Sequence, residues 1–126
     1  MRMILHAKFP HYFFNAAVKD GTAGAKIKRI LDQQKPEAAY FTEYGGTRGA
    51  ILVVDVTEAS KIPMFAEPWF LTFNADVEFH PAMTPQDLAR AGLEELGREW
   101  SGAESPAPSK SPGLPSNRPT FDKSTS

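Results

Sequence analysis

The sequence contains no cysteine. This absence excludes disulfide bonds, thiol nucleophiles and thiolate metal ligands from the chain. Proteins of reducing compartments do without disulfides, so the composition is consistent with a cytoplasmic location, which we expect.

The sequence also has no excess of charge of one sign. Its 14 Lys and Arg residues are matched by 15 Asp and Glu residues, for a net charge of -1. Because binding to a phosphate backbone depends on a basic surface, we expect no nucleic-acid partner. There is also no run of about 18 apolar residues, so we expect no membrane span. The opening residues lack the apolar core of a signal peptide.

What is present is sufficient for one folded domain. The chain has 126 residues, of which 41% are hydrophobic. The composition changes after residue 100, where Ser and Pro become frequent and apolar residues scarce. Such a segment cannot bury enough surface to offset the entropy lost on ordering. We therefore predict a folded domain over residues 1–100 and a disordered tail over residues 101–126.

The first half of the chain predicts three strands and one helical region. Alternation predicts a strand over residues 2–8, and apolar residues at helical spacing follow over 11–34. The segment DGTAG at 20–24 weakens the helix, which leaves a kink or two shorter helices as alternatives. Strands over 38–44 and 48–56 are joined by Gly-Gly, the signature of a tight hairpin. That hairpin places Glu43 opposite Arg48, where a surface ion pair is expected.

The second half predicts two helices around one strand. A helix is expected over 57–70, ended or kinked by Pro68. An alternating strand follows over 74–80. Thr84 before Pro85 is typical of a helix start, and that third helix is expected to continue despite Gly92.

The element order β-α-β-β-α-β, followed by a short helix, defines the expected fold. Right-handed crossovers on this order give an α+β, ferredoxin-like antiparallel sheet with strand order 4-1-3-2. Both helical regions then cover one face. The apolar side chains expected to point toward them are those of Met3, Leu5, Phe41, Leu52, Val54, Val77 and Phe79. The opposite face takes Ile4, His6, Tyr40, Thr42, Ile51, Val53, Asp55, Asp76, Glu78 and His80.

This opposite face is too apolar at its centre to remain in water. A second copy of the chain, packed sheet to sheet, would cover it. The sequence therefore predicts a homodimer, a dimeric α+β barrel whose two sheets enclose a cavity.

Four ionisable residues of that face are the candidate catalytic groups: His6, Asp76, Glu78 and His80. Antiparallel pairing of the first and fourth strands brings His6 near Asp76 and Glu78. A histidine beside a carboxylate suits general acid–base catalysis. The alternative is a structural polar network on an edge strand, where charges discourage aggregation. No metal-binding signature such as HExxH occurs, so we expect neither a metal nor a cofactor.

Four further residues are candidates for substrate binding. Tyr40 and Asp55 would line the cavity or face the dimer seam. Trp69 and Phe70 would form an aromatic lid over a ring-shaped ligand or, alternatively, belong to the core.

The segments GGTRGAILVVDV and AEPWFLTFNADVEFHPAMTPQDL carry a resemblance. Over residues 1–100 the chain resembles a bacterial family of small proteins with a domain of unknown function, sometimes labelled pantothenate-synthetase-like. More remotely it is similar to the dimeric α+β barrel superfamily, with muconolactone isomerase, antibiotic-biosynthesis-type monooxygenases and stress-responsive barrel proteins. The resemblance implies the fold and the dimer but no activity. Some related barrels bind haem through a histidine, for which His6 or His80 would be the ligand.

Three interpretations of function remain open. The first is a small-molecule-binding dimeric barrel. The second is a cofactor-independent isomerase or monooxygenase that acts on an aromatic or lactone-like compound. The third is a non-catalytic structural or interaction protein whose sheet face serves dimerisation alone.

Overall fold

The computed structural model describes residues 1–102 of the chain. The predicted tail over 101–126 lies outside these residues except for its first two positions. The chain divides into two compact units, residues 1–82 and the segment that begins at Met83, and each is described by itself.

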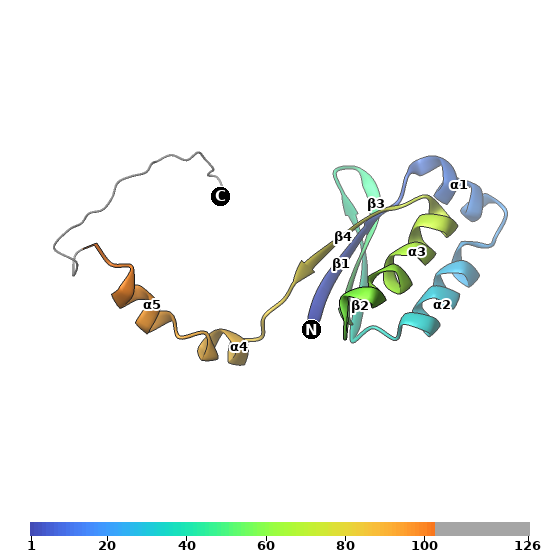
Figure 1. Ribbon diagram of the computed structural model, residues 1–126. Helices are drawn as coiled ribbons and strands as arrows, with labels where there is room; N and C mark the ends of the chain where they lie inside the picture. The colour runs from blue at the N-terminus through green and yellow to red at the C-terminus, as the bar shows by residue number, and fades with distance from the viewer. Residues whose placement is uncertain (103–126) are drawn as a thin grey trace. The chain divides into compact units, whose positions relative to one another are not determined.

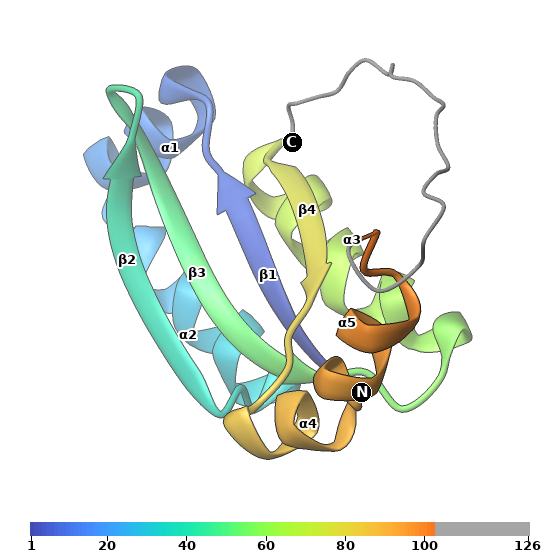
Figure 2. The same cartoon turned by 90° about the vertical axis from the view of Figure 1, so that its left-hand side faces the viewer.

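Residues 1–82 form an α+β unit with a four-stranded antiparallel sheet, as predicted. The strands lie in the order β2-β3-β1-β4, which from the β4 edge reads 4-1-3-2 (Figures 1 and 2). The elements are β1 (Arg2–Lys8), α1 (His11–Lys19), α2 (Ala23–Gln34), β2 (Ala38–Tyr44), β3 (Thr47–Asp55), the 3-10 turn η1 (Ala59–Lys61), α3 (Ile62–Phe73) and β4 (Asp76–Pro81).

The hairpin between β2 and β3 turns at Gly45 and Gly46, as predicted. Their φ angles are 60° and 82°, in the left-handed region that a two-residue loop requires. Glu43 pairs with Arg48 in the register, yet no ion pair joins them among the described residues. Arg48 instead donates from Nη1 to Asn15 Oδ1 at 2.8 Å. The predicted ion pair is wrong because Arg48 lies on the face that α1 covers.

The helical region over 11–34 consists of two helices, one of the two alternatives. The break lies at Asp20, Gly21 and Thr22, and Gly21 has a φ of 81°. Asp20 Oδ1 accepts hydrogen bonds from the Thr22 hydroxyl at 2.6 Å and from the Thr22 amide at 3.0 Å. These bonds lower the pKa of the Asp20 carboxyl and stabilise the turn between α1 and α2.

Helix α3 passes through Pro68 and continues to Phe73, which excludes an end at Pro68, one of the two alternatives. A proline has no amide hydrogen, so the carbonyl of Met64, four residues earlier, loses its helical donor. The side chain of Gln34 in α2 approaches this carbonyl and the next one along the helix. Its Nε2 donates to Phe65 O at 2.8 Å and, more weakly, to Met64 O at 3.5 Å, and its Oε1 accepts from Trp69 Nε1 at 3.2 Å.

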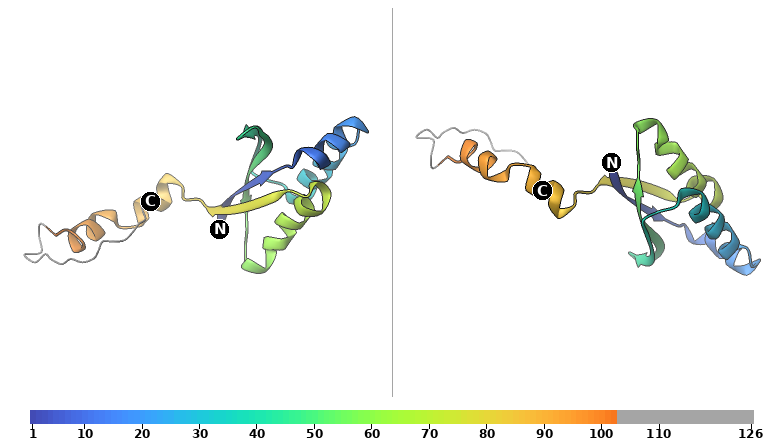
Figure 3. Two further views of the ribbon diagram at one scale, coloured as in Figure 1. Left: turned by 90° about the horizontal axis from the view of Figure 1, so that it is seen from above. Right: turned by 90° about the horizontal axis from the view of Figure 1, so that it is seen from below.

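The core lies between the sheet and α1, α2 and α3, which gather on one side of the strands (Figure 3). Phe9 is at its centre, with ring centroids of Phe14, Trp69 and Phe73 at 5.0, 5.7 and 5.3 Å. One predicted core residue departs from expectation. Phe41 is 49% exposed because it lies on β2, the strand at the sheet's edge. The largest fully buried side chains are Leu5, Phe9, Leu52, Val54, Trp69 and Phe73.

The segment after Met83 contains two short helices, α4 (Pro85–Arg90) and α5 (Leu93–Glu99). The predicted helix start, with Thr84 as the cap before Pro85, is confirmed. The Thr84 hydroxyl accepts from the Asp87 amide, and the Asp87 carboxylate accepts from the Thr84 amide. The predicted single helix is wrong, because Gly92 adopts a φ of 76° and separates the two. Within residues 1–102, no helix has both the length and the apolar content that a membrane span requires.

Candidate functional site

The sheet has a second face, opposite α1, α2 and α3, which we call the open face. Within residues 1–82 no helix covers it, and in Figure 2 the strands lie in front of the three helices. Strand alternation places there the side chains of Arg2, Ile4, His6, Lys8, Ala38, Tyr40, Thr42, Tyr44, Ile51, Val53, Asp55, Asp76, Glu78 and His80.

The four candidate catalytic residues share the open face, on β1 and β4. His6 lies opposite Glu78, as predicted, and on its other side opposite Ile51. Asp76 pairs with Lys8, and His80 pairs with Ile4. The register therefore brings His6 and Glu78 together at the level of the backbone.

The side chains do not complete that pairing. Glu78 Oε1 lies 3.2 Å from His80 Nε2, on the same strand. Both side chains are well exposed, at 69% and 60%, so this contact contributes less than about 1 kcal/mol. Glu78 and His80 thus fit the structural alternative, a solvated polar pair on an edge strand. His6 has no hydrogen bond to a carboxylate among the described residues.

The ring of His6 instead lies toward β3 and β2. Its Nε2 is buried, has no hydrogen-bond partner in the part of the chain that the structure describes, and would be 3.6 Å from a Cβ at position 49. Residue 49 is glycine, and a Cβ there would also approach Ala7 O to 3.1 Å. The ring of Tyr44 meets His6 edge-on, with centroids 5.0 Å apart and planes at 88°. The missing side chain at Gly49 therefore makes the space in which the His6 ring lies.

Within residues 1–102, the buried Nε2 of His6 lacks a partner in both tautomers of the neutral ring. A proton on Nε2 would be a buried donor without an acceptor, which costs about 1–3 kcal/mol. Of the two ring nitrogens only Nε2 is buried without a partner. An unprotonated Nε2 would be a buried acceptor without a donor, so either tautomer leaves this atom unpaired among the described residues.

Lys8 and Tyr44 complete the surroundings of His6. Lys8 follows His6 by two residues on β1, so both side chains leave the same face. Its Nζ lies 5.5 Å from the centroid of the Tyr44 ring, a cation–π distance. We call His6, Lys8, Tyr44 and Gly49 the His6 cluster. Sequence reasoning missed the last three, although alternation along β1 and the hairpin register place them beside His6.

The substrate-binding candidates Tyr40 and Asp55 lie apart from each other. Tyr40 is on the open face opposite Ile51 and is 65% exposed. Asp55 ends β3, and its Oδ1 accepts from the amino group of Met1 at 3.0 Å. Its backbone pairs with that of Arg2, which lies four residues before His6 on β1. Tyr40 is therefore near the His6 cluster, whereas Asp55 is at the end of the sheet.

Trp69 and Phe70 do not lie on the open face. Trp69 is fully buried in the core and hydrogen-bonded to Gln34. Phe70 is on the same helix, on the covered side of the sheet, and is 38% exposed. Trp69 is therefore a core residue, which was the alternative to an aromatic lid. Neither ring can act as a lid over the His6 cluster, because the sheet lies between them.

Within residues 1–102, no group of three or more His, Asp or Glu side chains is arranged to hold a metal ion. No protein-family model and no curated protein matches the chain. The function must therefore be argued from the open face itself.

Proposed function

We propose that this protein is a homodimeric, ferredoxin-like α+β barrel that binds a small molecule between the open faces of its two copies. The observation that carries the proposal is the His6 cluster. It combines an imidazole with a buried, unpartnered Nε2, an aromatic ring and a cation, on a sheet face that residues 1–82 leave uncovered. Buried polar atoms are nearly always paired, so an unpaired one points to a missing partner.

The apolar centre of the open face supports the dimer. Ile4, Ile51 and Val53 are only half-buried, and Tyr40 and Tyr44 are 65% and 57% exposed. Large exposed apolar areas are typical of protein interfaces. A two-fold axis lets the same face pack against itself, which covers these side chains in both copies.

The His6 cluster indicates the chemistry of the ligand. The His6 imidazole can donate or accept a hydrogen bond, Lys8 supplies positive charge, and Tyr44 supplies a flat apolar wall. A small ring compound with a carbonyl or carboxylate oxygen complements all three. Binding is favoured over acid–base catalysis because no carboxylate of the described residues bonds to the His6 ring to orient it as a base.

Sedimentation velocity at micromolar concentration tests the dimer. We expect the wild type to sediment as a dimer and Ile51→Asp as a folded monomer, because it places a charge at the centre of the seam. Val18→Asp is the matched control. Val18 is an exposed apolar residue of α1, on the other side of the sheet, so its substitution should leave the dimer intact. A monomeric wild type would overturn the proposal.

Ligand binding is tested by NMR of the histidine rings, of which the chain has only three, at His6, His11 and His80. The probes are benzoate, phenol and δ-valerolactone. We expect at least one to shift the His6 signals saturably and Tyr44→Ala to abolish the shift, while His11→Ala leaves it unchanged. A dimer that responds to none of the probes would favour the third interpretation, a face used for dimerisation alone.

A further inference from the structure

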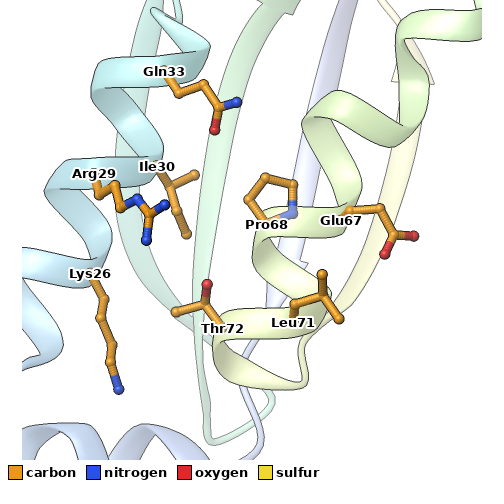
Figure 4. Close-up of a pocket in the computed structure, with 8 residues that line it drawn as sticks. All are labelled: Lys26, Arg29, Ile30, Gln33, Glu67, Pro68, Leu71 and Thr72. Atoms are coloured by element: carbon orange, nitrogen blue, oxygen red, sulfur yellow. The ribbon is translucent and has the colours of Figure 1, made fainter.

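A groove lies between α2 and α3, on the covered side of the sheet and separate from the open face (Figure 4). Its volume is about 470 Å³, which is within the range of small-molecule sites, roughly 300–1,000 Å³. Ile30, which is 3% exposed, and Pro68 form its floor. At its rim, Leu71 is 80% exposed, an apolar side chain that a ligand would cover.

Three polar side chains lie around this floor. Figure 4 shows the guanidinium of Arg29, the amide of Gln33 and the hydroxyl of Thr72 turned toward the groove, from α2 and α3. Within residues 1–102, none of these three side chains has a hydrogen bond or an ion pair. Each offers at least one donor, and the guanidinium offers only donors.

The charge around the groove is positive. Lys26 adds a second cation from α2, one turn before Arg29. Glu67 is the acidic residue of the lining, and its carboxylate extends away from Arg29, on the far side of α3 (Figure 4). The unpaired donors therefore lie on the side of the groove away from the Glu67 carboxylate, which suits an anionic acceptor.

We infer that this groove is a binding site for a small amphiphilic carboxylate. The carboxylate accepts hydrogen bonds from Arg29, as a bidentate pair, and from Gln33 and Thr72. The apolar body of the ligand lies on Ile30 and Pro68 and covers Leu71. The site is independent of the dimer, because it lies on the face of α2 and α3 that is turned away from the sheet.

Isothermal titration calorimetry with octanoate, below its micelle concentration, tests this site. We expect saturable binding to the wild type and at least about ten-fold weaker binding to Arg29→Gln, because a bidentate charged pair is lost. Lys28→Gln is the matched control. It removes the same charge from the same helix, but Lys28 is bonded to Asp32 at 2.7 Å and does not line the groove. Its affinity should equal that of the wild type.

Two further measurements separate the parts of the inference. Leu71→Ser should weaken octanoate binding several-fold, since the residue is exposed and its substitution leaves the fold intact. The Ile51→Asp variant should keep the affinity of the wild type, which shows that the groove does not depend on the open face. The inference is overturned if the wild type does not bind octanoate, if Lys28→Gln loses as much affinity as Arg29→Gln, or if octan-1-ol binds as tightly as octanoate.

Discussion

The two faces of the sheet are made by the same four strands, yet they differ in whether their buried polar atoms are hydrogen-bonded. On the covered side, the buried polar side chain is Gln34, and three hydrogen bonds engage both ends of its amide. On the open face, the buried Nε2 of His6 has no hydrogen-bond partner within residues 1–102. The polar side chain of the covered side is thus satisfied by its own chain, whereas the His6 nitrogen of the open face is not satisfied by any described residue.

The difference extends to the apolar side chains. Leu5 and Leu52 are fully buried on the covered side, while their sequence neighbours Ile4 and Ile51 are only half-buried on the open face. Alternation along a strand decides which side chains share a face, and the helices then decide which face becomes the core. The covered side therefore forms the core, and the open face leaves its apolar side chains partly exposed.

Trp69→Ala should have the largest effect, because it removes the biggest fully buried side chain of the covered side. We expect it to lower the free energy of unfolding by about 3–5 kcal/mol. Urea unfolding at low protein concentration, where the proposed dimer dissociates, measures this loss. Ile51→Ala on the open face should cost much less under the same conditions. Equal losses would show that the two faces do not differ in stability.

Gln34→Leu should come next. The substitution keeps the side chain's bulk but leaves Trp69 Nε1 and the carbonyl of Phe65 without a side-chain partner. A buried polar group left unpaired costs about 1–3 kcal/mol, and the same urea titration measures it. Gln33→Leu, one residue earlier and exposed, should change stability by less than about 0.5 kcal/mol. A neutral Gln34→Leu would show that α3 tolerates Pro68 without help from α2.

Gly49→Ala should have a smaller effect, on the open face. The new methyl group would lie 3.1 Å from Ala7 O, so the strands must shift slightly, at about 1 kcal/mol. It would also meet His6 Nε2 at 3.6 Å, so the NMR signals of the His6 ring should move. Gly24→Ala adds the same methyl group in open space and should leave those signals unchanged. Unmoved His6 signals in Gly49→Ala would contradict the described ring position.

The smallest effect should be a pH dependence at the end of the sheet. The Arg2 guanidinium bonds Glu37 in a bidentate pair at 2.8 and 2.9 Å and lowers the pKa of that carboxyl. Because the folded pKa is depressed, the stabilisation is present above the ordinary glutamate value, about 4.3, and is lost as the pH falls through the lower folded value. Thermal unfolding of wild type and Glu37→Gln should therefore converge in acid. A constant difference across pH would exclude this linkage.

Much of the fold could be predicted because its signals are local. Alternation over residues 2–8 matches β1, and Gly45-Gly46 predicts both the hairpin and its register. The capping box at Thr84 is likewise contained in four consecutive residues. The predicted neighbourhood of His6 and Glu78 was correct for the same reason, since strand pairing follows from topology and alternation.

The rest depended on side chains that meet only in the folded chain. Arg48 bonds Asn15 rather than Glu43, and Glu78 bonds His80 rather than His6, because the nearest partner depends on where each side chain turns. The sequence by itself determined the strands, the register of the hairpin between β2 and β3, and the residues that share each face. Only the tertiary structure decided that Trp69 is core, that Gln34 supports α3, and that His6 turns over Gly49. These outcomes depend on which distant segments approach one another, and no local pattern carries that information.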